Sequence, residues 1–154
     1  MNENSFDLAA LREIIDEVRD KNRRGYLDLQ TVENFIFHFD ELPTNEIKRE
    51  VYISLLDYLQ VIKGMDASEI NRNTSTEMYN KILAPIGIKY VLSSNFTVNF
   101  RISVLVYLFL IAVLIMFFLG IPLKIYIIVG VLFLAQFFRC VLKRKQKRVY
   151  GNFY

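Results

Sequence analysis

Acidic residues are missing from the second half of this chain of 154 residues. All 16 aspartates and glutamates lie before Met78, whereas the 19 lysines and arginines continue towards the end. Residues 1–100 therefore carry net negative charge, and residues 101–154 carry only positive charge. Because the overall charge averages two unlike parts, it does not by itself indicate a nucleic-acid-binding protein.

Cysteine and histidine are almost absent as well. Cys140 is the only cysteine, which excludes an internal disulfide and fits a reducing compartment. His38 is the only histidine, and we interpret it as structural because no cysteine or acidic cluster at metal-ligand spacing accompanies it. No Ser/His/Asp, Cys/His or paired-carboxylate arrangement is recognisable. We therefore expect no enzyme, no metal site and no cofactor.

Two long apolar runs follow residue 101, and Lys124 is the only charge between Ile102 and Phe138. The first run, 102–119, is long enough at about 1.5 Å per residue to cross a bilayer core of roughly 30 Å. Gly120 and Pro122 fit a tight turn, and the second run, 122–142, ends in the sequence KRKQKR. The sequence predicts a transmembrane hairpin over residues 101–142 and a basic cytosolic tail over 143–154. A buried hairpin inside a soluble protein is the alternative.

Charges predict how this hairpin is oriented. Six cations mark the end of the second run, whereas only Lys124 lies at the turn, so the positive-inside rule puts both termini in the cytosol. The N-terminus has neither a basic start nor an apolar run, and we expect no signal peptide. We therefore predict a multi-pass protein of the inner (plasma) membrane.

A polar stripe runs along the second span. Gln136, Arg139 and Lys143 are three and four residues apart, so they share one helical face. One interpretation is that they line a pore within an assembly, because lipid does not solvate such groups. The other is that Gln136 makes one interhelical hydrogen bond while Arg139 snorkels to the headgroups.

Residues 1–83 have the periodicity of an all-α cytosolic bundle. Helices are expected from Asn4 or Ser5, with Thr44 capping the third, Gly64 ending it, and Thr74 or Ser75 starting the last. Residues 84–100 alternate apolar and polar side chains and are expected to form a linker, either a short strand or an interfacial segment.

The loop Asp20–Thr31 resembles an EF-hand calcium loop. Asp20 stands at the first ligand position and Gly25 at the required sixth. Arg24 and Thr31 replace the oxygen-rich fifth and twelfth ligands, so we expect a degenerate EF-hand-like helix pair or a plain helix–glycine–helix turn, without calcium affinity.

Cations gather at the same turn. Helix C-termini favour cations, which makes a solvated helix end one interpretation. The other is a phosphate-binding patch for a nucleotide or oligonucleotide, with an aromatic ring available for stacking. The candidate residues of this patch are Arg19, Lys21, Arg23, Arg24 and Tyr26.

A short cytosolic helical domain in front of a two-helix hairpin resembles the small two-pass membrane effectors of bacterial anti-phage defence. The resemblance rests on chain length and the order of the parts. It implies that the soluble domain senses a nucleotide-type signal and that the hairpins form a homo-oligomeric pore or disrupt the lipid bilayer. The alternatives are a membrane-anchored adaptor or accessory subunit that docks a protein partner, and an immunity-type protein that neutralises a membrane-acting toxin.

Overall fold

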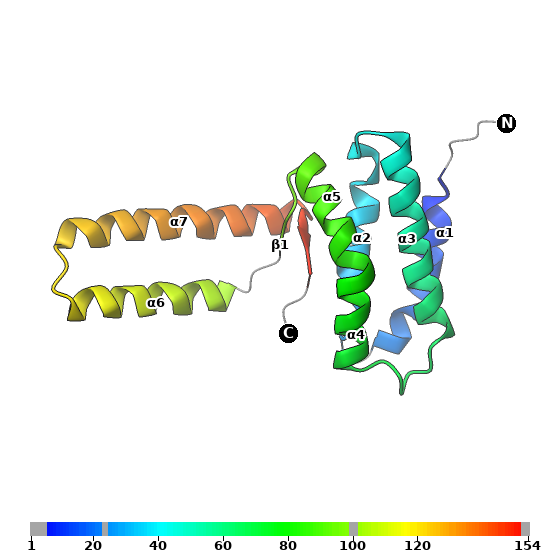
Figure 1. Ribbon diagram of the computed structural model, residues 1–154, viewed down its shortest axis with the longest axis horizontal. Coiled ribbons are helices and arrows are strands. Elements are labelled where there is room, and N and C mark those ends of the chain that lie inside the picture. Colours follow the sequence, from blue (N-terminus) through cyan, green and yellow to red (C-terminus); the bar gives the residue numbers. More distant parts are fainter. Residues whose placement is uncertain (1–5, 23–24, 99–101, 152–154) are drawn as a thin grey trace.

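The computed structural model describes residues 6–22, 25–98 and 102–151, and it is mostly helical, as the sequence predicts (Figure 1). A helical bundle and a long helical hairpin make up the molecule, and the hairpin projects sideways from the bundle. The elements are α1 (Leu8–Arg19), α2 (Leu29–Phe37), α3 (Asn45–Gly64), α4 (Arg72–Met78), α5 (Ala84–Ser94), β1 (Thr97–Val98), α6 (Ile102–Phe118), α7 (Leu123–Lys145) and β2 (Val149–Tyr150), with 3-10 turns at Asp20–Asn22 and Phe39–Glu41 and a π-helical turn at Tyr79–Leu83.

The first three helices begin and end where local chemistry dictates. Asp7 caps α1 by accepting a hydrogen bond from the backbone of Ala10 at 3.0 Å. Thr44 caps α3 and Gly64 is its last residue, which confirms both predictions. The apolar faces of the three helices meet in one core that includes Leu11, Ile15, Val18, Val32, Phe35, Ile36, Val51, Leu55, Leu59 and Ile62.

The fourth helix starts earlier than predicted. Asn71 caps α4 by accepting from two backbone N–H groups, so neither Thr74 nor Ser75 begins it. A π-helical turn then joins α4 to α5, where Ala84 N–H bonds to a carbonyl five residues back. Pro85 lacks the N–H that a regular α-helical turn needs here, which accounts for the wider turn.

Residues 84–94 do not form the linker that the sequence predicts, whereas 97–98 form a short strand. Residues 84–94 form α5, a helix that packs in the bundle core because Ile86 and Tyr90 are buried. The Tyr90 ring stacks on Phe35 at 4.6 Å, and its hydroxyl donates to the Phe35 carbonyl at 2.6 Å. Ile86 and Tyr90 belong to an alternating apolar pattern, but they are also four residues apart, which places both on one face of a helix. The alternation therefore does not distinguish a strand from a helix here.

The basic tail is also part of the fold. Helix α7 continues to Lys145, and β2 then pairs with β1 as a two-stranded parallel sheet. Thr97 lies opposite Val149, and Tyr150 is buried in the bundle core. The chain therefore leaves the bundle at β1 and returns to it at β2.

The hairpin of α6 and α7 lies outside this core. Gly120, with φ of 63°, ends α6 in the left-handed conformation, and two paired backbone bonds close the helix end. The rings of Phe109 and Phe133 stack at 4.3 Å between the two helices. Among the described helices, α7 is the one long and apolar enough to cross a membrane, and none of its apolar window is buried. The apolar part described in α6, Val104–Phe118, is shorter.

Candidate functional site

The chain turns back onto the bundle immediately after α7, in residues 146–151, which we call the return segment. Lys147 adopts a left-handed conformation with φ of 55°, and its N–H bonds to the carbonyl of Arg144 at 3.0 Å. Glycine is the usual residue at such a position, and a side chain there costs roughly 1 kcal/mol. Strained backbone positions cluster at functional sites, so the Lys147 side chain is a candidate site residue.

A polar network holds the return segment against α2 and α5. His38 Nε2 donates to the carbonyl oxygen of Gln146 at 2.8 Å, since a carbonyl can only accept. His38 Nδ1 lies 2.8 Å from Oε1 of Glu41. Arg148 forms a two-pronged ion pair with Glu41, both contacts being 2.8 Å, and also donates to the Ser94 carbonyl. His38 therefore has the expected structural role, because it contacts both Glu41 and the return segment.

Strand β2 fits tightly against the same helices. Asn34 of α2 donates to the carbonyl of Val149 at 2.8 Å. The Tyr150 ring lies against Gly87 of α5 so closely that a Cβ atom at Gly87 would be 2.3 Å from a ring carbon. The bundle is therefore rigidly connected to the end of α7.

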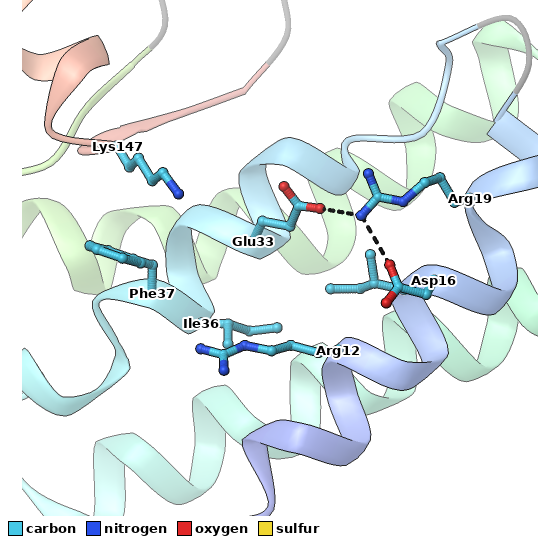
Figure 2. A pocket seen from close by; sticks show the side chains of 8 residues that line it. Arg12, Asp16, Arg19, Glu33, Ile36, Phe37 and Lys147 are labelled. Atoms are coloured by element: carbon cyan, nitrogen blue, oxygen red, sulfur yellow. Dashed lines mark hydrogen bonds and ion pairs between the residues drawn. The ribbon is translucent and has the colours of Figure 1, made fainter.

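A cavity of about 340 Å³ opens between α1, α2 and the return segment, and we call it the bundle pocket (Figure 2). Its apolar wall consists of Ile15, Ile36 and Phe37, and Lys147 reaches in from the return segment with Nζ 4.7 Å from the centre of the Phe37 ring. The charged side chains that line it are Arg12, Asp16, Arg19, Glu33 and Lys147.

Charge in the bundle pocket is only partly compensated. Arg19 contacts Asp16 at 3.1 Å and Glu33 at 2.8 Å, and the hydrogen bond to Asp16 together with the Glu33 charge raises the pKa of Arg19. Within the described part of the chain, Arg12 forms no ion pair or hydrogen bond. Arg12 and Lys147 are thus two cations of the pocket without an anionic partner among the described residues, and Lys147 lies over the Phe37 ring.

The described residues of the predicted phosphate patch do not share one site. Lys21 turns away from it and donates to the carbonyls of Lys63 and Met65 at 2.6 and 2.8 Å, which caps the end of α3. Tyr26 is half-buried and packs against the core. Arg23 and Arg24 lie outside the described residues, and among the patch residues that are described, Arg19 is the one that lines the pocket.

Sequence reasoning missed two of the three cations that line the bundle pocket. Arg12 could have been found, because it lies four residues before Asp16 and seven before Arg19 on one face of α1. Lys147 gave no signal beyond its place in a basic run.

The EF-hand-like loop is described only in part. Asp28 is buried at the start of α2, and the Thr31 hydroxyl accepts from the Gly151 backbone at 3.0 Å. Both side chains are thus packed within the fold. Among the described residues, no group of three or more histidines, cysteines or acids could hold a metal ion.

The predicted pore-lining residues separate at the base of the hairpin. Lys143 is buried and donates to the Asn95 carbonyl at 2.8 Å, so it joins the hairpin to the bundle. Gln136 and Arg139 line a second cavity of about 470 Å³ between α7, α5 and β1, which we call the junction cavity.

Comparison with known proteins finds no relative of this chain. No protein-family model matches the chain, and neither does any curated protein or solved structure with which it was compared.

Proposed function

We propose that the chain is a two-pass membrane protein whose hairpin of α6 and α7 crosses the bilayer, while the cytosolic bundle binds a ligand and passes the signal to the hairpin. The observation that carries the proposal is an exposed apolar hairpin whose two ends are both fixed to one folded bundle. In the full proposal the hairpins assemble into a pore.

The dimensions of the hairpin support the crossing. With 17 and 23 residues, α6 and α7 are about 26 and 34 Å long at 1.5 Å per residue, close to the bilayer core. Phe117, Phe118 and Leu119 at the far tip are 70% or more exposed, and such a surface needs lipid or another protein to cover it. Because β1 and β2 are paired, both ends of the hairpin stay on the bundle side of the membrane, where the cations cluster.

The bundle pocket supports the ligand-binding part. Its Lys147 belongs to the return segment, so a ligand held between Arg12 and Lys147 contacts both the bundle and the chain that follows α7. A nucleotide suits this chemistry, with phosphate on the two cations and the base over Phe37.

A matched pair of arginine variants tests the ligand. Arg12→Ala removes a cation of the pocket, and Arg49→Ala removes an exposed arginine of α3 as control. Binding of adenine and guanine mononucleotides and cyclic dinucleotides is measured by calorimetry on the detergent-solubilised protein. We expect Arg12→Ala and Lys147→Gly to weaken binding about tenfold, as for loss of one charge-assisted hydrogen bond. Equal affinities in all four proteins would contradict the pocket.

Pore formation requires an oligomer, because a single hairpin encloses no path. Purified protein in liposomes is expected to release chloride and to run as a closed assembly in mild detergent. The resemblance to anti-phage effectors makes defence the context to test, by counting phage plaques on cells with and without the protein. A monomer in tight liposomes would contradict the pore.

A membrane-anchored adaptor is the second candidate, and the junction favours it. Lys143 is used to join the hairpin to the bundle, and Gln136 and Arg139 face the junction cavity, so the rest of the span offers few polar groups to line a pore. Ile88 and Leu92, one turn apart on α5, are 56% and 82% exposed and offer an apolar surface to a partner.

A further inference from the structure

We propose that the junction cavity binds the phosphate of an anionic phospholipid from the cytosolic leaflet. The inference rests on the proposed function only in requiring that α6 and α7 enter the bilayer. The cavity lies where α7 meets α5 and β1, and Gln136 and Arg139 are the polar side chains that α7 contributes to it.

The depth of the cavity fits a lipid headgroup. Arg139 lies sixteen residues beyond Leu123, which is about 24 Å along α7 and close to the edge of a hydrocarbon core of roughly 30 Å. One turn further, Lys143 is already buried against the backbone of Asn95. The cavity therefore opens between the end of the lipid-facing helix and the start of the bundle, at headgroup level.

Arg139 has no anionic partner among the described residues. Within the described residues, neither Arg139 nor Gln136 forms a hydrogen bond or ion pair. No residue that lines the cavity is acidic, and no acid follows Glu77 anywhere in the sequence. Arg139 is exposed beside an apolar surface, so its guanidinium can pair with an anion from outside the chain.

A phospholipid phosphate is the anion that is abundant at this depth. A guanidinium binds phosphate through two parallel hydrogen bonds, and basic pockets beside membrane helices on the cytosolic side hold lipid headgroups. Val91, Phe96 and Val98 form an apolar side of the same cavity, which suits the glycerol and the first methylenes of the acyl chains. A soluble anion would leave this apolar side uncovered.

The test compares two variants that lose the same charge. Full-length protein is reconstituted into phosphatidylcholine nanodiscs with and without phosphatidylglycerol, and retained lipid is counted by native mass spectrometry. Arg139→Gln removes the cation of the cavity, whereas Lys124→Gln removes one at the far tip of the hairpin. We expect about a tenfold loss of phosphatidylglycerol affinity in Arg139→Gln alone, the size of one charge-assisted contact.

Each other outcome overturns part of the inference. Equal retention by Arg139→Gln, Lys124→Gln and the unchanged protein shows that the cavity is not the site. Displacement of the lipid by inorganic phosphate shows a general anion site instead of a lipid site. Protein that does not incorporate into nanodiscs, or that carbonate washes off membranes, overturns the membrane crossing and the lipid site together. Gln136→Leu, which keeps the net charge, is the second variant should Arg139→Gln not fold, and its retention of phosphatidylglycerol must fall as well.

Discussion

Single residues at the base of the hairpin connect it to the bundle. Glu41 accepts two hydrogen bonds from Arg148 of the return segment and lies 2.8 Å from Nδ1 of His38, whose Nε2 contacts Gln146. Partial burial raises the pKa of Glu41, but the hydrogen bonds from His38 and Arg148 outweigh it, and the net pKa is lowered. An anionic Glu41 is therefore part of what holds the return segment in place.

The lowered pKa of Glu41 predicts a pH dependence. Its stabilisation is complete above the ordinary value of 4.5 and is lost as pH falls through the lower pKa of the folded protein. Thermal unfolding between neutral and acid pH should therefore show a steeper loss for the unchanged protein than for Glu41→Gln. Glu46→Gln, at an exposed glutamate of α3, is the control and should follow the unchanged protein. Parallel curves for all three proteins would contradict a stabilising role for Glu41.

Residue-level chemistry was predictable where it is local. Thr44, Gly64 and Gly120 act through their own backbone or residues a few positions away, and the sequence predicted each correctly. Arg148 and Lys147 act through contacts with residues more than 100 positions earlier, which no spacing rule detects. Lys21 shows the same limit, because it caps a helix end about 40 residues further along the chain.

At the scale of elements, α5 and β2 complete the bundle. Neither was predicted as part of it, because the apolar residues of α5 also alternate and β2 has only two residues. Burial of Tyr79 beside the return segment raises its pKa to about 12, in keeping with a closed core at this contact. Helix α5 and strand β2 hold the return segment that carries Lys147, so the place of Lys147 in the bundle pocket could not be predicted.

The contact between α5 and β2 is tested at its closest point. Gly87→Ala places a methyl group where the Tyr150 ring lies. Overpacking of this kind lowers the free energy of unfolding by about 1–3 kcal/mol. Gly64→Ala, where nothing lies within 4 Å, is the matched control. We expect lower thermal stability and faster hydrogen exchange in residues 146–151 for Gly87→Ala only. Equal protection of the return segment in both variants would show that it is not docked at α5.

On the scale of the whole molecule, an acid-containing bundle and an acid-free hairpin are joined by paired strands. The sequence predicted the hairpin boundaries within a few residues, since apolar length and a glycine turn are local signals. Their attachment to the bundle required long-range pairing and was not predictable.

The proposed topology has a direct test in intact cells. In a Cys140→Ser background, Lys124→Cys marks the hairpin tip and Ser68→Cys marks an exposed loop of the bundle. An impermeant thiol reagent should label Lys124→Cys strongly and Ser68→Cys only after the cells are opened, because the proposed topology places the tip outside. Labelling of Ser68→Cys alone in closed cells would reverse the orientation.

The place of Tyr150 in the core has a consequence for how the protein is made. The ribosome synthesises this part of the bundle core after both hairpin helices, so under the proposed topology the bundle is incomplete while the hairpin enters the membrane. Tyr150 can reach Gly87 only when both hairpin ends emerge on the same side. A chain that crosses once leaves its core open and exposed to proteases. Under the proposed topology, completion of the bundle therefore requires that both hairpin helices are inserted.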